Sequence, residues 1–460
     1  MTKQFSRRNF LAASGAVGFG GAFLNGYTPT VLVASDASVD DKPAILGGKA
    51  FSLGNVPGWP ILQGDEEKLL LEVLNKKIWC RTQDFKVADF EKTYAAMNGA
   101  KHCIATNSGT SSLINSLAAL EIGPGDEVIT SPYTFVATIN CILSHFALPV
   151  VADVDLESFQ LDPAKADAAC TENTALLLPV HIGGLPADMD AFLEIGERRK
   201  LPVVEDACQA HLGQWRGKNL GAVGTAGCFS FQGTKNLACG DGGAILTNDD
   251  VLAEKIYACH NNGRGRGLIS SDFSYNSVRG RNNRMVEFAG AVLCAQAVAI
   301  EKYAETRQEN GMYLNKLLSE IPGVIPAKQY SGVTRSAWHL YMFRIDKEQF
   351  GLDNGMFIKA LNAENIPGWH GYGAVDWTDY TKNVYSTRAA GRLYSKKFLD
   401  DWTERVGNLP MYKRLCREAV WFGQHLLLGP KQNMDIIADA VRCIQKNAAQ
   451  ITQRADAGPR

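Results

Sequence analysis

The sequence predicts an α/β fold in which a large domain carries a central, mostly parallel sheet and a smaller α+β domain follows at the C-terminus. The chain has 460 residues, which is too long for one compact core. Short apolar runs alternate with helical stretches from about Gly99 to Gly243, as is typical of a parallel sheet covered on both faces. Beyond a long helical stretch near residues 288–308, this alternation of strands and helices gives way to a different pattern. We therefore expect a large domain over residues 50–305 and a small domain over residues 306–450.

The elements of the large domain follow from these periodicities. Apolar runs of strand length predict strands at His102–Thr106, Glu127–Ile129, Pro149–Val154, Thr174–Pro179, Pro202–Glu205, Cys228–Phe231 and Gly243–Thr247. The segments between them predict helices that include Ser111–Leu120, Phe135–Ser144 and Met189–Lys200. In such a sheet, ligands bind where the carboxyl ends of strands lead into helices.

A long helical stretch over Phe288–Gln308 marks the change of pattern. The small domain is then expected to contain elements at Val324–Tyr330, Ala337–Arg344, Asn354–Glu364 and Met434–Ala449. Two glycine-rich segments predict loops, at Asn261–Gly280 and Trp369–Ala390.

The N-terminus differs from the rest of the chain. Arg7 and Arg8 precede Phe10 and a mildly apolar run from Ala12 to Leu24, the order found in a twin-arginine signal peptide. Residues 1–35 are therefore predicted to be such a signal, and the protein to be periplasmic or otherwise exported. The alternative is a disordered tail that contains two arginines, in which case the protein stays in the cytoplasm.

The composition of the chain limits the classes of partner that it is expected to bind. Lys and Arg total 47 against 48 for Asp and Glu, so no bulk charge favours nucleic acid. No stretch beyond the N-terminus approaches the roughly 20 apolar residues of a membrane-spanning helix. The 11 cysteines form no C-x-x-C pair and the histidines no H-x-x-x-H, so we expect no metal.

Three segments carry candidate chemistry, and the first is a small, hydroxyl-rich turn. Thr106–Ser112 ends one predicted strand and opens a helix, where free backbone N–H groups and the helix dipole favour a phosphate. An ordinary helix cap explains the same residues equally well. The turn alone therefore does not distinguish a phosphate site from a helix cap.

The second segment places Asp206 at the end of a buried strand, within Leu201–His211. A carboxylate there is costly unless it meets a cation or hydrogen-bond donors. The pyridine nitrogen of pyridoxal phosphate is one such partner, because a carboxylate keeps that nitrogen protonated. A helix cap or a metal ligand remains an open alternative for this segment.

The third segment contains Lys235, just after the apolar run Cys228–Phe231 and before Gly240–Gly243. Desolvation among small residues lowers the pKa of a lysine and makes it a nucleophile toward an aldehyde. A solvated loop lysine would explain neither the apolar strand before it nor the glycines around it. The order of turn, aspartate and lysine thus indicates a pyridoxal-phosphate enzyme.

The chain resembles the sugar aminotransferases of the DegT/StrS type, which have the aspartate aminotransferase fold (fold type I). The resemblance runs from about Pro57 to Ala449 and is strongest for the aminocyclitol aminotransferase and 3-amino-5-hydroxybenzoate synthase branch. Motifs in the family's order carry it: Asn107–Thr110, Pro132–Thr138, Pro179–His181, Pro186–Asp190, Glu205–His211, Phe229–Phe231 with Thr234–Asn236, Asn282–Glu287 and Val420–His425.

The resemblance implies roles for individual residues. Lys235 would form the Schiff base with pyridoxal phosphate, and Asp206 would pair with the pyridine nitrogen. Gln209 would reach the ring hydroxyl and Phe135 would stack on the ring. The remaining roles implied are the phosphate ligands Gly109, Thr110 and Ser230, a second phosphate contact by Asn282 from a neighbouring subunit of a homodimer, and substrate contacts by His181, His339 and Tyr341. For His181, a histidine buried in the core is the alternative.

The implied reaction moves an amino group from glutamine or glutamate to a keto-sugar or a cyclitol ketone. Two features depart from the family pattern: Asp241 replaces the usual glutamate, and Asn262–Gly267 is unusually basic. An exported dinucleotide-dependent oxidoreductase is one rival, but its G-x-G-x-x-G motif after the first strand is absent. A dehydratase of the same family would carry histidine at position 235. A non-catalytic sugar-binding or regulatory protein would not need Lys235, Asp206 and Gln209 intact.

Overall fold

The computed structural model describes residues 41–456, except for residues 82, 268–277 and 389. The expected signal peptide at residues 1–35 and half of the predicted loop Asn261–Gly280 lie outside the described residues. Within them, no helix is both long enough and apolar enough to cross a membrane.

The main sheet is mixed but mostly parallel. Its strand order is β3-β2-β4 followed by β5-β8-β9-β1, and the parallel bridges Leu177↔Val203 and Val180↔Asp206 join β4 to β5. Among these strands only β9 is antiparallel to its neighbours. The strands are β1 (His102–Thr106), β2 (Glu127–Thr130), β3 (Leu148–Val151), β4 (Thr174–Leu178), β5 (Val204–Asp206), β8 (Ala226–Ser230) and β9 (Gly243–Thr247). The predicted α/β architecture with a mostly parallel sheet is confirmed.

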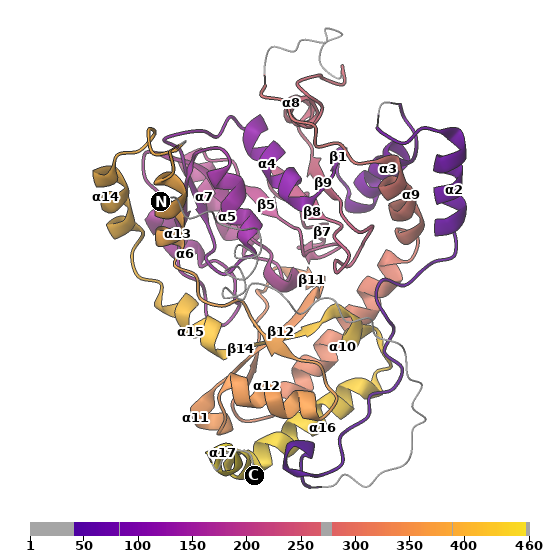
Figure 1. The fold of residues 1–460 in the computed structure, drawn as a ribbon, viewed down its shortest axis with the longest axis vertical. Helices are drawn as coiled ribbons and strands as arrows, with labels where there is room; N and C mark the ends of the chain where they lie inside the picture. The colour runs from indigo at the N-terminus through magenta and orange to yellow at the C-terminus, as the bar shows by residue number, and fades with distance from the viewer. Residues whose placement is uncertain (1–40, 82, 268–277, 389, 457–460) are drawn as a thin grey trace, which may run out of the picture. The chain divides into compact units, whose positions relative to one another are not determined.

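Successive residues of each strand enter different hydrophobic layers, as a pleated strand requires. Val204 packs in one layer, and its neighbour Val203 packs in the other. The same alternation holds for Cys228 and Phe229 in β8. Helices therefore cover both faces, as Figure 1 shows. They include α3 (Lys86–Asn98), α4 (Gly109–Ala119), α5 (Val136–Leu143), α6 (Pro163–Ala169), α7 (Met189–Arg199) and α8 (Asp250–His260).

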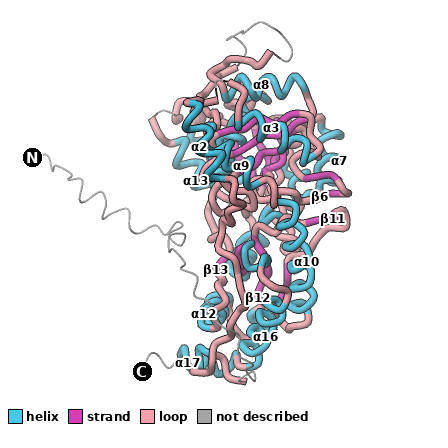
Figure 2. The backbone as a smooth tube through the Cα atoms, turned by 90° about the vertical axis from the view of Figure 1, so that its right-hand side faces the viewer, coloured by secondary structure: helices cyan, strands magenta, loops and turns pink. Residues whose placement is uncertain are grey.

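The C-terminal part forms a second sheet, which is antiparallel throughout, in the order β10-β12-β14-β13. Helices α10 and α16 lie side by side against it in Figures 1 and 2. The elements are α10 (Ile300–Ser319), β10 (Val324–Pro326), β12 (Leu340–Ile345), α12 (Asn354–Ala363), β13 (Trp369–His370), β14 (Ala419–Gly423), α16 (Gln432–Lys446) and α17 (Ala448–Asp456). The predicted domain boundary near residue 305 falls inside α10 and stays a prediction.

The described structure also contains a small third sheet, in the order β11-β6-β7, and further helices. The strands are β6 (Gln214–Trp215), β7 (Lys218–Asn219) and β11 (Val333–Arg335), and the helices are α2 (Glu66–Lys76), α9 (Glu287–Gln296), α11 (Lys347–Phe350), α14 (Lys396–Val406) and α15 (Pro410–Glu418).

Two predicted segments need correction. The predicted loop Trp369–Ala390 contains β13 and the helix α13 (Trp377–Tyr385). Asp376 caps this helix by accepting hydrogen bonds from the backbone N–H groups of its first turn. Trp377, Thr381 and Tyr385 are buried at a spacing of four residues. The predicted helix Phe288–Gln308 is two helices, α9 and α10, which are separated at residues 297–299.

Candidate active site

The hydroxyl-rich turn lies where predicted, between the end of β1 and the start of α4. Ser108 caps α4, and its side-chain oxygen accepts a hydrogen bond from Ser111 N at 3.1 Å. Thr106 Oγ1 and Ser112 Oγ are 2.7 Å apart and hold the turn together. Ser111 N and Ser112 N both donate to Ser108, whereas the backbone N–H groups of Gly109 and Thr110, in the first turn of α4, have no acceptor within the helix and can bind an anion.

Gly109 and Ser230 come together because β1 and β8 both end at the same edge of the sheet. A Cβ atom at Gly109 would lie 2.6 Å from Ser230 Cβ and 3.0 Å from Cys208 Sγ. Any side chain at position 109 would therefore fill the space above the start of α4. This close approach brings the predicted phosphate ligands into one cradle.

Asp206 ends β5 and is 5% exposed. Its Oδ2 accepts a hydrogen bond from Thr138 Oγ1 at 2.7 Å, and its Oδ1 accepts one from Cys208 N at 3.2 Å. Thr138 is held in turn by Thr134, with 2.7 Å between the two hydroxyl oxygens. Two donors fix the carboxylate but do not use all of its lone pairs, so it can still accept a bond from a protonated ring nitrogen.

Lys235 lies in the segment between β8 and β9, which is held by backbone hydrogen bonds. Lys235 N donates to Gln232 O at 2.8 Å, and Lys235 O accepts from Trp59 Nε1 at 3.0 Å. The residue is partly buried. Desolvation lowers the pKa of its ammonium group, against the opposing effects of Cys208 and Asp206. A larger fraction of this amine is neutral at a given pH than in a solvated lysine.

Gln209 and Phe135 lie near the edge of the main sheet at which β1, β5 and β8 end. Gln209 Oε1 accepts a hydrogen bond from Gly183 N at 2.6 Å, and its Nε2 donates to Tyr372 Oη at 3.3 Å. Phe135 precedes α5, and 58% of its surface is exposed, so its ring is open to contact. Asn282 is also exposed, and the neighbouring Asn283 O accepts a hydrogen bond from Asn107 N at 2.9 Å in the turn.

The three predicted substrate residues are all buried. His181 is 0% exposed, its Nε2 donates to Glu205 Oε2 at 3.0 Å, and its Nδ1 accepts from Ala187 N at 3.1 Å. With both ring nitrogens bonded, His181 does not face a substrate as expected. It supports the end of β4 instead.

Tyr341 also departs from the expectation. Its ring is 0% exposed and is stacked between Trp338 and Phe422, at interplanar angles of 13° and 15°. His339 is 7% exposed, and its Nδ1 lies 3.3 Å from Asn236 Oδ1. Burial lowers the pKa of His339 well below its usual value, and the positive charge of Lys235 lowers it further. A neutral His339 beside the neighbour of Lys235 remains compatible with a role at the site.

These residues fit pyridoxal phosphate. A cradle that a Cβ atom would fill, a fixed buried carboxylate and a lysine of lowered pKa meet at the carboxyl ends of β1, β5 and β8. Thr138, Trp59 and Tyr372 also contact this group, although no role was predicted for them. A signal for Thr138 was present, because it lies in the first turn of α5, three residues after Phe135, which caps that helix.

Comparisons with known proteins agree with this geometry. The spore coat polysaccharide biosynthesis protein SpsC of Bacillus subtilis is 40% identical over 286 residues, which are 61% of this chain and 73% of that protein. The L-glutamine:scyllo-inosose aminotransferase of Streptomyces griseus is 32% identical over 90% of this chain and 100% of its own length. The crystal structure of 3-amino-5-hydroxybenzoic acid synthase has a TM-score of 0.72 at 30% identity, covering 85% of this chain and 99% of that one.

The match to a family extends over most of the chain. The sequence model of the DegT/DnrJ/EryC1/StrS aminotransferase family matches residues 60–421, which include the turn, Asp206 and Lys235. This match to an aminotransferase family excludes the dinucleotide-dependent oxidoreductase considered above. The chain belongs to the DegT/DnrJ/EryC1/StrS family and is a pyridoxal-phosphate-dependent aminotransferase.

Proposed function

We propose that this enzyme transfers an amino group from glutamine or glutamate to the ketone of a sugar or cyclitol, with pyridoxal phosphate held by Lys235. The observation that carries the proposal is the meeting of Lys235, Asp206 and the Gly109–Ser230 cradle at one edge of the sheet. The choice of substrates is supported by the Streptomyces griseus relative, whose name specifies glutamine and scyllo-inosose.

The cofactor, when bound, supplies an electron sink that the side chains lack. Asp206 would hold a proton on the pyridine nitrogen, and the hydrogen bonds from Thr138 and Cys208 N keep that carboxylate in place. Lys235 Nζ would carry the proton to and from the donor carbon, because desolvation lowers its pKa and so makes it a better proton acceptor and donor than a solvated lysine at the same pH. The start of α4 and Ser230 would hold the phosphate.

The assembly and cellular location belong to the same proposal. The exposed rings and loops beside the cradle, Phe135 and Asn282 among them, suit a homodimer in which Asn282 reaches the partner's phosphate. Residues 1–35 would direct export by the twin-arginine route, and a free sugar or cyclitol outside the cytoplasm would then be the acceptor.

The first test is the absorption spectrum of the purified protein reconstituted with pyridoxal phosphate. We expect a near-visible band that bleaches when glutamine or glutamate is added. Lys235→Ala should lose the band, whereas Lys328→Ala, at an exposed lysine paired with Glu157, should keep it. A wild-type protein that never acquires the band would contradict the proposal. Bleached enzyme that recovers with scyllo-inosose, but not with a nucleotide-linked keto-sugar, would identify the cyclitol class.

A further inference from the structure

The segment that follows β13 extends from the C-terminal sheet onto the large domain and has no role in the function described so far. It comprises residues 371–385 and includes α13. This helix lies beside α5 in Figure 1, where Tyr380 Oη donates to Asn140 Oδ1 at 2.9 Å. Just before α13, the half-buried Tyr372 contacts Gln209. A side chain from the C-terminal part of the chain therefore reaches the candidate cofactor site.

The side-chain amide of Gln209 has only one orientation that satisfies its neighbours. The backbone N–H of Gly183 can only donate, so the atom that faces it at 2.6 Å must be the carbonyl oxygen Oε1. The amide nitrogen Nε2 then faces Tyr372 Oη at 3.3 Å and donates one of its two hydrogens there. The other hydrogen is available to the ring hydroxyl of pyridoxal phosphate, which is the contact expected of Gln209.

The ring of Tyr372 is held in place by two edge-to-face aromatic contacts. Its centre lies 4.7 Å from that of Trp421 at an interplanar angle of 87°, and 5.4 Å from that of Tyr133 at 70°. A Cβ atom at Gly371 would overlap Tyr133 Oη, so the backbone beside Tyr372 can approach this closely only with glycine there. The position of the Tyr372 hydroxyl is thus set by the packing of its own segment and not by Gln209.

We propose that Tyr372 is a positioning residue that directs the amide of Gln209 toward the ring hydroxyl of the cofactor. The inference rests on the proposed function, because it concerns the cofactor that Lys235 would hold. Gly183 fixes Oε1 from the large domain, and among residues 41–456 that the structure describes, Nε2 has Tyr372 Oη as its hydrogen-bond partner. Without the Tyr372 hydroxyl, the amide is anchored at one atom only and its plane can turn.

The direction of the expected effect follows from where negative charge lies on the cofactor. The ring oxygen carries its full charge only after the proton that it shares with the Schiff-base nitrogen has left. An N–H group of Gln209 that donates to this oxygen therefore favours the deprotonated form. It lowers the pH at which the near-visible band changes, and a poorly directed N–H group should raise that pH. Burial raises the pKa of the Tyr372 hydroxyl, so this group stays neutral near neutral pH and does not titrate together with the band.

The test is a pH titration of the near-visible band of the purified holoenzyme, which needs neither substrate nor turnover. Tyr372→Phe keeps the aromatic ring and removes only the hydroxyl, and we expect it to raise the midpoint by about 0.5–1 pH unit. Gln209→Ala removes the donor itself and should raise the midpoint further. Adding Tyr372→Phe to Gln209→Ala should cause no additional rise, because Tyr372 acts through Gln209. An unchanged midpoint in Tyr372→Phe, or an equal rise in both backgrounds, would overturn the positioning role.

Tyr380→Phe is the matched control. It removes a hydroxyl that holds the same segment, through Asn140, without contacting Gln209, so its midpoint should equal that of the wild type. A rise as large as that of Tyr372→Phe would overturn the inference, because loosening of the segment would then be the cause. If Tyr372→Phe does not fold, Tyr372→Met removes the same hydroxyl and carries the comparison.

The outcomes also separate this inference from the proposed function. A holoenzyme that shows the expected midpoints, yet is bleached by neither glutamine nor glutamate, would contradict the proposed function alone. A holoenzyme that is bleached by a donor, but whose midpoint does not depend on Tyr372, would overturn the positioning role alone.

Discussion

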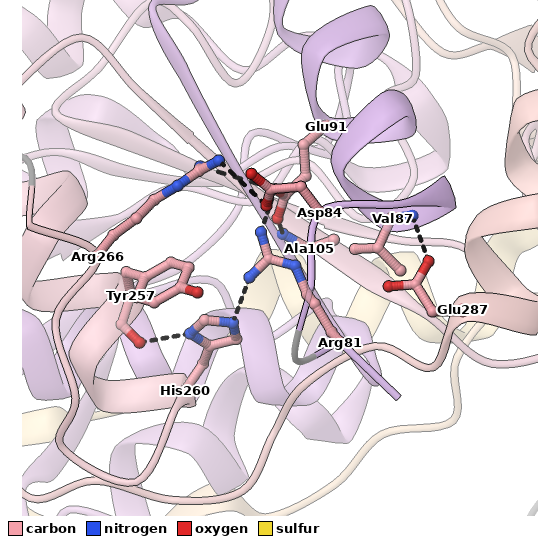
Figure 3. A network of polar contacts seen from close by, with 9 residues as sticks. All are labelled: Arg81, Asp84, Val87, Glu91, Ala105, Tyr257, His260, Arg266 and Glu287. Carbon is pink, nitrogen blue, oxygen red and sulfur yellow. Dashed lines mark hydrogen bonds and ion pairs between the residues drawn. The ribbon is translucent and has the colours of Figure 1, made fainter. Parts of the chain in front are cut away.

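Two buried arginines in this enzyme have opposite surroundings. Arg81 is paired with Glu91, and its Nη1 lies 3.2 Å from His260 Nε2 (Figure 3). Glu91 also accepts a hydrogen bond from Ala105 N at 2.7 Å in β1. The coulombic attraction of Glu91 overcomes the desolvation of Arg81 and raises its pKa, whereas burial lowers the pKa of Arg307 to about 9.

The difference separates a buried charge that is paired inside the fold from a buried charge that has no counter-ion among the described residues. The Arg81 network joins α3, β1 and the end of α8, and His260 O accepts a hydrogen bond from Asn283 N at 2.9 Å, beside Asn282. Its partners all come from this chain, so its role is complete without a ligand. Arg307, on α10, is fully buried and donates to one neutral acceptor, Gln424 Oε1, at 2.7 Å.

The largest effect should come from breaking the paired cluster. Arg81→Met leaves Glu91 buried without its main counter-charge, and we expect it to lower the free energy of unfolding by about 3–5 kcal/mol. Urea denaturation followed by circular dichroism measures the change. Adding Glu91→Gln should recover a large part of it, because the buried charge is then removed. A loss below about 1 kcal/mol in the single variant would show that Arg266, 3.9 Å from Glu91, compensates alone.

A smaller effect should appear in how the free energy of unfolding depends on pH. Burial and the Arg81 charge lower the pKa of His260 to about 3. Below about pH 6.5 the unfolded chain binds a proton at this residue and the native state does not, so stability falls as the pH falls toward 3. His260→Gln keeps an acceptor for Arg81 and should reduce the loss between pH 7 and pH 5 by about 2 kcal/mol. If the wild type and His260→Gln lose the same free energy of unfolding between pH 7 and pH 5, protonation of His260 in the unfolded chain does not cause that loss.

The smallest effect on stability should come from the unpaired arginine. Arg307→Met removes a desolvated cation that has a single neutral acceptor, so its free energy of unfolding should stay within about 1 kcal/mol of the wild type. The same urea titration as for Arg81→Met measures it, which makes the two variants a matched pair. A loss as large as that of Arg81→Met would mean that the two clusters do not differ as described.

The central residues of the site could be predicted because each follows a strand whose apolar pattern is plain. Lys235, Asp206 and Gly109 lie at the ends or beyond the ends of β8, β5 and β1, and parallel strands bring such positions together. The positions of these strands along the chain could be predicted from their apolar runs alone, without knowledge of distant contacts. Their assembly into one site therefore follows from local sequence.

The residues that departed from expectation depend on contacts that the sequence does not display. The burial of His181 depends on Glu205, 24 positions away, and that of Tyr341 on Phe422 in another strand. The burial of Arg307 was not predicted, because a single arginine in an amphipathic helix has the sequence pattern of a solvated residue. Its unmet hydrogen bonds appear only when α10, Trp59 and Gln424 are packed together.

The Arg81 network also bears on the order in which the chain can fold. Arg81 and His260 are separated by 179 positions, and Glu91 and Arg81 by only 10. Closing the longer loop costs more entropy, and the ion pair can be desolvated only after β1 and α8 have docked on each other. We expect the network to form late, once most of the first 285 residues are in place. Hydrogen exchange at Ala105 N would then report completion of the whole large sheet.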